Sequence, residues 1–403
     1  MPSTLPEGDP APVDGSLPAA ALAEVADRAF GIYLHVPFCR TRCGYCDFNT
    51  YTAAELGPGA SRSDYVDSAL AEIELAARVL GDRAPRVDTV FVGGGTPTLL
   101  PPAELARLLT GVRERWGLAE DAEVTTESNP DSVSAADLVA LREAGFTRIS
   151  FGMQSAAEHV LRVLDREHTP GRAQQAVAEA RAAGFESISL DLIYGTPGES
   201  VDDWRRSLEA ALAAEVDHLS AYSLIVEDGT RLAGRVRRGE LAMPDEDDLA
   251  DKYLLASEML STQGFSAYEV SNWARGEQHR CRHNLGYWRG DTWWGIGPGA
   301  HSHVGGVRFW NVKHPVAYAG RLAAGESPAY ARESLDADSR RIERVLLELR
   351  LAEGLPLAVL SDSERTRVDS VVARGLAEMR DDRLVLTLDG RLLADGVVRD
   401  LLD

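Results

Sequence analysis

The stretch of sequence that decides the fold is HVPFCRTRCGYCDF at residues 35–48, which contains Cys39, Cys43 and Cys46. Three thiolates spaced Cys-x3-Cys-x2-Cys on one loop can bind the same soft metal centre. Stopping at three leaves one iron of a 4Fe-4S cluster without a protein ligand. The stretch therefore predicts a 4Fe-4S cluster with one open iron, where chemistry can take place.

Other uses of the three cysteines stay open at this point. A zinc site usually takes four Cys or His ligands in pairs, and no second pair follows at the expected distance. A disulfide within the loop would leave an odd thiol, and the chain shows no secretory signal pattern. Zinc, a disulfide and unmodified thiols are thus weaker interpretations than a single iron-sulfur loop.

The spacing resembles that of the radical S-adenosylmethionine (SAM) superfamily. This resemblance implies that the amine and carboxylate of SAM bind the fourth iron, and that reduction of the cluster releases a 5'-deoxyadenosyl radical. It also implies an electron donor that reduces the cluster.

The charge composition of the chain indicates which kinds of binding partner are disfavoured. The 63 acidic and 42 basic residues give a net charge of −21, which disfavours nucleic acid and anionic membrane surfaces. No apolar run approaches the ~20 residues that span a bilayer, so no integral membrane segment is expected. Iron-sulfur thiolates persist where thiols stay reduced, which predicts a cytoplasmic protein.

Six short β-rich runs alternate with long amphipathic runs from residue 31 onward, a pattern typical of βα units and a parallel sheet. Six units are too few to close an eight-stranded barrel, so we predict an α/β fold, an open three-quarter (β/α)6 barrel of radical SAM type over residues 29–270. The expected strands are 31–36, 87–92, 123–126, 147–151, 187–192 and 217–223. The expected helices are 64–80, 102–115, 134–144, 171–183 and 201–213.

The remaining segments have different compositions. Residues 1–28 are rich in Pro, Ala, Gly and Asp and predict a disordered tail. Residues 271–333 are dense in His, Trp and Gly, and the family resemblance described below implies that this segment is associated with haem. Residues 334–403 predict helices followed by a hairpin, which suggests a small winged-helix-like C-terminal domain.

Unusual residues follow the predicted strands. In parallel β/α folds, functional groups gather at the C-terminal ends of the strands. Gly94 and Gly95 follow the second strand, where missing side chains let backbone amides approach a ligand. Glu127, Gln154 and Asp191 follow the next three and can bind ribose hydroxyls and an amino group. Taken singly, each is also compatible with a tight turn, a helix cap or a surface position.

From about residue 30 to the C-terminus, the chain resembles the oxygen-independent coproporphyrinogen III oxidase family, and within it the haem chaperone branch. The resemblance implies cluster ligands at the three cysteines already named. It also implies SAM contacts from Tyr33, Tyr45, Gly94, Gly95, Thr96, Glu127, Gln154, Arg166 and Asp191.

Two features separate the branches. The oxidases continue to a fourth cysteine in a Cys-x3-Cys-x-Phe-Cys-x-Cys pattern, whereas this chain has Phe48 at that position and Tyr45 in place of the Phe. The stretch His283-Asn284-Leu285-Gly286-Tyr287-Trp288 resembles the His-Asn-x-x-Tyr-Trp element that is associated with haem in the chaperones. The resemblance implies haem contacts from His283, Tyr287 and Trp288.

Residue chemistry leaves the haem assignment open. A His beside Tyr and Trp offers an imidazole for iron and flat apolar surface for a macrocycle. The same residues are equally compatible with a buried His and structural aromatics, and Cys281 is either an alternative thiolate ligand or an inert buried thiol. His279, His301, His303 and His314 enrich the same segment but stay outside the predicted site.

The leading hypothesis is a radical SAM-type haem chaperone that binds a 4Fe-4S cluster, SAM and haem and delivers haem to acceptors such as respiratory haem proteins. The alternative is an oxidase that decarboxylates coproporphyrinogen III in porphyrin biosynthesis, from which both sequence departures point away. A nucleic-acid-modifying radical enzyme is disfavoured by the net charge of −21. A homodimer is compatible with the sequence.

Overall fold

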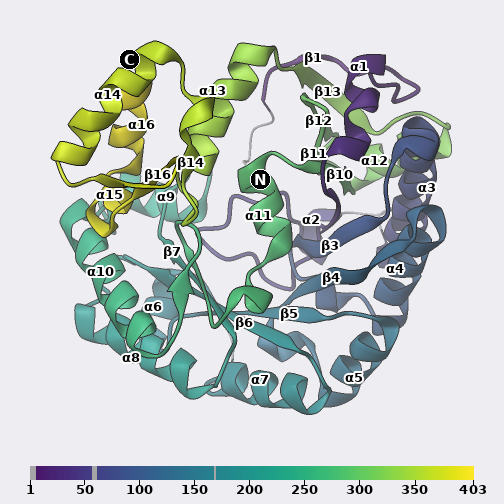
Figure 1. Cartoon of the computed structure of the whole chain (residues 1–403). Helices are drawn as coiled ribbons and strands as arrows, with labels where there is room; N and C mark the ends of the chain where they lie inside the picture. The colour runs from purple at the N-terminus through teal and green to yellow at the C-terminus, as the bar shows by residue number, and fades with distance from the viewer. Residues whose placement is uncertain (1–5, 57–60, 168) are drawn as a thin grey trace.

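The fold is built on one large, strongly curved sheet (Figure 1). The computed structural model describes residues 6–56, 61–167 and 169–403. Within these residues, thirteen strands form a sheet in the order β1-β13-β12-β11-β10-β2-β3-β4-β5-β6-β7-β9-β8. Its parallel centre is β2 (Phe30–Val36), β3 (Val87–Gly94), β4 (Leu118–Ser128), β5 (Arg148–Gln154), β6 (Ser187–Tyr194) and β7 (His218–Ser223). These are the six predicted strands, in the predicted parallel arrangement.

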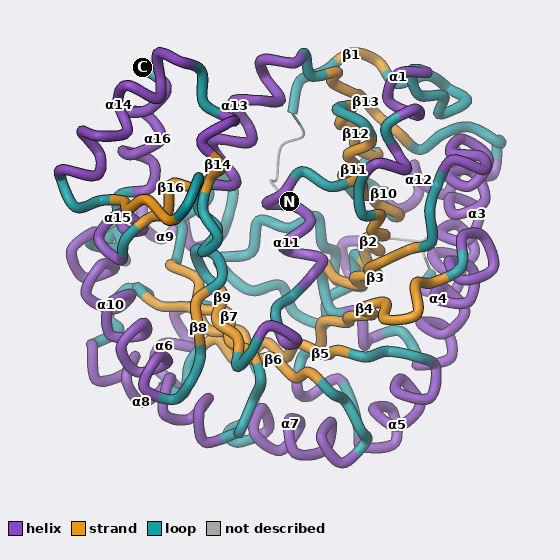
Figure 2. The backbone as a smooth tube through the Cα atoms, in the orientation of Figure 1, coloured by secondary structure: helices purple, strands orange, loops and turns teal. Residues whose placement is uncertain are grey.

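Helices cover the outer face of this parallel centre, and the strands curve around an inner space (Figure 2). The covering helices are α3 (Arg62–Leu80), α4 (Pro102–Trp116), α5 (Ala135–Ala144), α7 (Arg172–Ala182), α8 (Val201–Ala213) and α10 (Glu246–Thr262). Two short helices, α6 (Glu158–Val163) and α9 (Arg231–Arg237), instead pack together beside the loop that follows β2. The predicted open (β/α)6 barrel is confirmed. Its mouth is the end at which β2 to β7 terminate, and its floor is the opposite end.

Local sequence explains where these helices form. Tyr65, Ile73 and Leu80 recur at helical spacing in α3, and all three side chains are buried against the sheet. The capping box between Ser134 and Asp137 starts α5 by satisfying backbone amides that have no partner within the helix. A capping box of this kind fixes the residue at which the helix begins.

The histidine- and tryptophan-rich segment extends both edges of the sheet. Next to β2 lie parallel β10 (Thr292–Ile296), then antiparallel β11 (His301–Val304), β12 (Val307–Asn311) and β13 (Ala329–Ser334). Beyond β7 lie β9 (Asn272–Ala274) and β8 (Ser266–Ala267). Residues 271–333 are therefore part of the same layer as the barrel, because their alternating apolar side chains pack into its core.

The N-terminal stretch is folded where the structure describes it. β1 (Asp9–Pro10) pairs with β13, and Ala21 and Val25 are buried near α1 (Ala19–Ala23). The expected disordered tail is therefore wrong for residues 6–28, since small apolar side chains cover the open edge of the sheet there. Residues 1–5 of that prediction lie outside the described residues.

The C-terminal residues have a small core of their own, which includes Val345, Leu355, Val371, Leu384 and Val397. Helix α13 (Ala337–Glu348) leads into a three-stranded sheet in the order β14-β16-β15. The remaining elements are β14 (Leu355–Pro356), α14 (Asp362–Ala373), β15 (Ala377–Arg380), β16 (Arg383–Leu386), α15 (Leu388–Leu392) and α16 (Ala394–Leu402). Helices around a short hairpin sheet agree with the predicted extra C-terminal domain.

Three further helices complete the chain: α2 (Ala53–Leu56), α11 (Arg282–Arg289) and α12 (Pro315–Ala323). Helix α11 lies in the middle of the ring of strands (Figure 1), against the N-terminal parts of β3 and β4 and beside α13. It closes the floor of the barrel. Across the described ranges, no helix combines the length and apolar character needed to cross a membrane.

Candidate functional site

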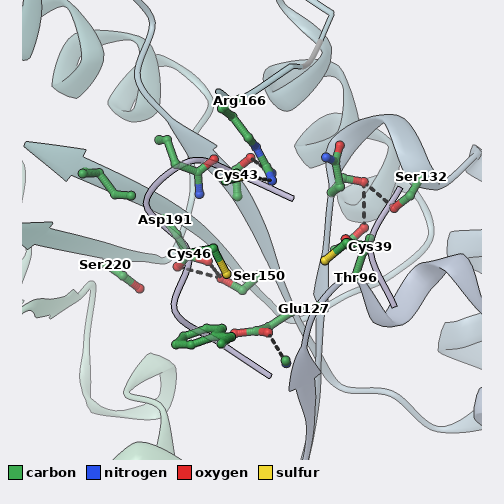
Figure 3. A pocket seen from close by; sticks show the side chains of 18 of the residues that line it. Cys39, Cys43, Cys46, Thr96, Glu127, Ser132, Ser150, Arg166, Asp191 and Ser220 are labelled. Carbon is green, nitrogen blue, oxygen red and sulfur yellow. Dashed lines mark hydrogen bonds between the residues drawn. The ribbon is translucent and has the colours of Figure 1, made fainter. Parts of the chain in front are cut away.

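The three cysteines of the predicted cluster lie on a loop that leaves the mouth end of β2, here called the cysteine loop (residues 39–51). Backbone hydrogen bonds hold it, from Cys39 N–H to Tyr51 O at 3.0 Å and from Gly44 N–H to Leu164 O at 2.9 Å. All three thiols are free and line one cavity of about 820 Å³ (Figure 3). Backbone hydrogen bonds therefore hold the cysteine loop in place, and its thiols face a cavity large enough for a ligand.

The same cavity collects the residues that the sequence predicted for SAM. These residues come from five strands, the cysteine loop, the turn after β3 and the segment after α6. Lining the cavity are Tyr33, Tyr45, Gly94, Gly95, Thr96, Glu127, Gln154, Arg166 and Asp191.

The glycine turn after β3 allows the cysteine loop to approach the strand ends closely. A Cβ on Gly95 would lie 2.4 Å from Phe38 O and 3.0 Å from Cys39 Sγ. Gly94 has φ +110°, and a Cβ there would lie 2.7 Å from the His35 ring. A side chain at Gly95 would push the cysteine loop away, and one at Gly94 would collide with His35 of β2, so glycine is required at both positions for packing.

The backbone amides of this turn do not point to a ligand, in contrast to the sequence expectation. Each is bonded within the fold, because the turn must hold both the cysteine loop and the next strand. The pairs are Gly94 N–H to Glu127 Oε2 (3.0 Å), Gly95 N–H to Val36 O (2.8 Å) and Thr96 N–H to Phe38 O (2.7 Å).

Two carboxyl groups face the cavity from adjacent parts of its wall. Burial, and then the charge of Asp191, raise the pKa of Glu127 to about 8. Burial also raises the pKa of Asp191, although the Ser150 hydroxyl donates to its oxygens at 2.9 and 3.0 Å. Two half-buried carboxyls near one another favour a cationic ligand, since a positive charge between them relieves their repulsion.

Two further polar side chains have unsatisfied atoms in the cavity wall. Arg166 donates to Gly152 O at 3.0 Å and to Cys43 Sγ at 3.6 Å (Figure 3). Among the described residues, its buried Nε has no hydrogen-bond partner, and neither has the buried Oε1 of Gln154. Buried polar atoms without partners carry a free-energy cost that a polar ligand can remove. These atoms fit a ligand with carboxylate, amine and hydroxyl groups, as SAM has.

A phenol and an imidazole connect the cavity wall to the cysteine loop. His35 Nε2 lies 2.9 Å from Asn49 O, and a carbonyl only accepts, so the proton of this ring is on Nε2. Its Nδ1 therefore accepts the hydrogen bond from Tyr33 OH at 3.0 Å. Sequence reasoning found Tyr33 but missed His35, whose position two residues further along the same strand was the available signal.

The three thiols line the same cavity (Figure 3). In a 4Fe-4S cluster each thiolate binds a different iron, so thiols that share one cavity are compatible with such a cluster. Within the part of the chain that the structure describes, no group of three His, Cys, Asp or Glu side chains is arranged to hold a single metal ion.

The predicted haem residues lie at the floor. His283 is 3% exposed, and its ring stacks on Phe91 with centroids 5.3 Å apart. Its Nδ1 lies 2.8 Å from Thr89 Oγ1, and its Nε2 lies 2.9 Å from Tyr287 OH. Burial lowers the pKa of His283 to about 3, so the ring is neutral. Both nitrogens are engaged, and the expectation that this imidazole is presented to haem iron does not fit this conformation.

Trp288 and Asn284, which lie on the same helix as His283, have different neighbours. Trp288 packs against a small core with Tyr268 and Cys281, and the thiol of Cys281 is buried. Asn284 lines the large cavity from below. The structure thus brings the residues predicted for haem together on α11, but at the end of the barrel opposite the thiols.

Sequence reasoning missed three side chains, Ser189, His218 and Tyr268, that are linked by hydrogen bonds at the cavity wall. Ser189 Oγ lies 2.7 Å from His218 Nδ1, and His218 Nε2 lies 2.8 Å from Tyr268 OH. Ser189 and His218 are paired in the parallel register of β6 and β7 and line the cavity. Ser189 stands two residues before Asp191, so strand periodicity was the signal that could have found it.

Comparisons with known proteins show the family of this chain. A family model described as the Radical SAM superfamily matches residues 33–211. The chain is 58% identical over 383 residues to "Heme chaperone HemW" of Mycobacterium tuberculosis (strain ATCC 25618 / H37Rv), a match that covers 94% of this chain and 97% of that protein. It is 33% identical over 380 residues to the protein of the same name from Escherichia coli (strain K12), covering 91% and 96% of the two chains.

A solved structure shares the architecture. Coproporphyrinogen III oxidase (HemN) from Escherichia coli superimposes with a TM-score of 0.78 at 22% identity, covering 94% of this chain and 92% of that one. This likeness confirms the predicted fold class, including the additional C-terminal domain. Together with the sequence matches over nearly the full length, it shows that the chain belongs to the HemW family of radical SAM proteins.

Proposed function

We propose that this protein is a haem chaperone that carries a 4Fe-4S cluster on Cys39, Cys43 and Cys46, binds SAM in the cavity at the mouth of the barrel, and delivers haem to acceptor proteins. The observation that carries the proposal is the single cavity that three free thiols share with two half-buried carboxyls and a half-buried guanidinium. The haem function rests on the similarity to proteins named haem chaperones.

In this proposal each side chain has a simple task. The thiols hold the cluster, which when bound supplies an open iron and an electron. Glu127 and Asp191 bind the cationic and hydroxyl groups of SAM, and Arg166 binds its carboxylate, since a guanidinium pairs well with a carboxylate. Tyr33 bonds to His35, which connects this ligand to the end of the cysteine loop.

The cellular location of the protein and its partners follow from the same proposal. Because iron-sulfur thiolates need reduced surroundings, we propose a cytoplasmic protein with an electron donor to the cluster. Haem acceptors such as respiratory enzymes are the proposed destination of haem. Contacts from α11 residues His283, Tyr287 and Trp288 to haem would require this helix to move, because the ring nitrogens of His283 are engaged in the floor.

The decisive experiment uses the reconstituted, reduced protein. We expect it to bind SAM and haem, to transfer haem to an apo haem protein, and to leave coproporphyrinogen III unchanged. Stoichiometric formation of protoporphyrinogen in the presence of SAM would overturn the chaperone proposal in favour of the oxidase. Haem transfer is followed by the absorption of the acceptor, and porphyrin products are separated by chromatography.

A further inference from the structure

The last residues of the cysteine loop, residues 49–51, are linked to two of the three cysteines. Cys39 N–H donates to Tyr51 O at 3.0 Å. Cys46 lies three positions before Asn49 on the same short stretch of chain. The position of residues 49–51 therefore influences the positions of both Cys39 and Cys46.

The side chain of Asn49 is held by a distant part of the chain, which we call the edge segment (residues 297–313). Asn49 is 4% exposed, and its Nδ2 donates to Pro298 O and to Lys313 O, both at 2.9 Å. Its Oδ1 accepts from the Tyr51 hydroxyl at 3.1 Å. Because carbonyl oxygens only accept, the amide can face the edge segment only with its NH2 group. Both of its donors are used, and its orientation is fixed.

The backbone of Asn49 is held by the barrel itself. His35 Nε2 donates to Asn49 O at 2.9 Å, and His35 Nδ1 accepts from the Tyr33 hydroxyl at 3.0 Å. Tyr33 lines the large cavity together with the three thiols. Asn49 therefore joins the cysteine loop, the cavity wall at β2 and the edge segment.

The two parts of the edge segment that meet Asn49 are bonded to each other. Pro298 lies in the turn between β10 and β11, and Lys313 lies just beyond β12. Gly299 N–H donates to Val312 O at 2.9 Å and closes the pair. The amide of Asn49 thus binds across two connected backbone turns.

A buried carboxyl group on α3 anchors the edge segment from behind. Glu72 is 1% exposed and accepts from Gly297 N–H and Asn311 Nδ2, both at 2.7 Å. It also accepts from the Tyr318 hydroxyl at 2.6 Å. Three donors from different parts of the chain on one buried carboxyl group make a rigid support. The partners of Asn49 are therefore fixed independently of the cysteine loop.

The close approach of the edge segment to Asn49 depends on a glycine. Gly299 has φ +72°, and a Cβ there would lie 2.6 Å from Asn49 Nδ2 and 3.0 Å from Asn49 Cγ. A side chain at position 299 would push the Asn49 amide away from its two carbonyl partners.

We infer, building on the proposed 4Fe-4S cluster and SAM site, that Asn49 is a positioning residue, which holds the end of the cysteine loop where its thiols face the cavity. It acts through Cys39 and Cys46 and does not itself bind iron. The histidine- and tryptophan-rich part of the chain, to which the edge segment belongs, thereby supports the cluster site at the mouth of the barrel.

The test disturbs this contact from both sides. Asn49→Ala removes the two donated hydrogen bonds, whereas Gly299→Ala displaces the amide without altering the sequence of the cysteine loop. We expect both reconstituted variants to contain iron and sulfide and to bind SAM about fivefold more weakly. The electron paramagnetic resonance spectrum of the reduced cluster should differ from that of the wild type and respond less to added SAM. A loss of stability alone would not change this spectrum.

Two control variants separate positioning from a general loss of stability. Gly325 has φ +74°, so Gly325→Ala carries backbone strain similar to that of Gly299→Ala, but a Cβ there would have no described atom within 4 Å. Ser302→Ala removes a 2% exposed hydroxyl of β11 that accepts from Gly295 N–H at 2.9 Å. Both controls should keep the wild-type spectrum and SAM affinity.

The outcomes distinguish this inference from the proposed function. Wild-type spectrum and SAM affinity in both Asn49→Ala and Gly299→Ala would overturn the positioning role. Equal changes in Gly325→Ala or Ser302→Ala would also overturn it. A wild-type protein that assembles no cluster would instead overturn the proposed function. If Asn49→Ala does not fold, Asn49→Ser, which keeps one donor, takes its place with the same expectations.

Discussion

The mouth and the floor of the barrel both carry polar side chains but differ in how far the fold satisfies their hydrogen bonds. At the mouth, three thiols are free, and the buried polar atoms Arg166 Nε and Gln154 Oε1 have no hydrogen-bond partner within the described residues. At the floor, both nitrogens of His283 are bonded, and its ring is packed between aromatic side chains. From residue type alone, both ends of the barrel were predicted to be binding sites.

The difference teaches that availability decides which candidate can bind a ligand. A polar group that the fold already satisfies must break a hydrogen bond before it can bind anything else, and it loses that free energy. A buried group left unsatisfied gains from a ligand instead. The mouth is therefore built for binding, and the floor is built for closing the barrel.

The largest expected effect is at the mouth. Cys39→Ala, Cys43→Ala and Cys46→Ala should each abolish the cluster, because the cysteine loop offers only these three thiols. Iron and sulfide content after anaerobic reconstitution measures this. Cys281→Ala is the control, since its thiol is buried at the floor, and a full cluster in any cysteine-loop variant would refute the assignment.

The next effect is on stability, at the floor. His283→Ala leaves the buried Thr89 hydroxyl and the Tyr287 hydroxyl without their partner, which should lower the free energy of unfolding by about 3 kcal/mol. Chemical denaturation measures the loss. Cluster content should be unchanged. An unaltered unfolding midpoint would show that the floor is not held by this residue.

A smaller effect is expected on SAM binding. Glu127→Ala and Asp191→Ala each remove a carboxyl from the cavity wall and should weaken SAM binding by about 1.5–3 kcal/mol. Calorimetric titration of the reconstituted protein gives the affinity. Cluster content is the control, because neither residue is a predicted ligand of iron. Wild-type affinity in both variants would exclude them from the SAM site.

The smallest effect is a pH dependence. The pKa of Glu127 is raised to about 8, so near pH 7 its carboxyl is mostly protonated before a ligand arrives. A cationic ligand lowers this pKa, so the complex holds fewer protons than the unliganded protein. Affinity should therefore rise with pH, by up to about tenfold per unit, and level off above about pH 8. Glu127→Gln should flatten this rise, and an unchanged profile in that variant would contradict the role of Glu127.

Much of the site could be predicted from the sequence, because the alternation of strands and helices along the chain indicates which residues lie at the same end of the sheet. The six strands were predicted from alternating runs, and parallel strands end at the same edge of a sheet. Glu127, Gln154 and Asp191 could therefore be assigned to one end before any coordinates. Assignment of residues 6–28 failed, because the pairing of β1 with β13 depends on a partner more than 300 positions away in the chain.

The sequence by itself determined the local chemistry: three thiols on one loop, carboxyls at strand ends and a glycine turn where no side chain fits. Only the tertiary structure decided which polar groups are already satisfied. It engaged the amides of Gly94 to Thr96 and both nitrogens of His283, and it left Arg166 Nε and Gln154 Oε1 without a hydrogen-bond partner among the described residues. Hydrogen-bond satisfaction and burial depend on neighbours brought together by folding, and spacing along the chain does not encode them.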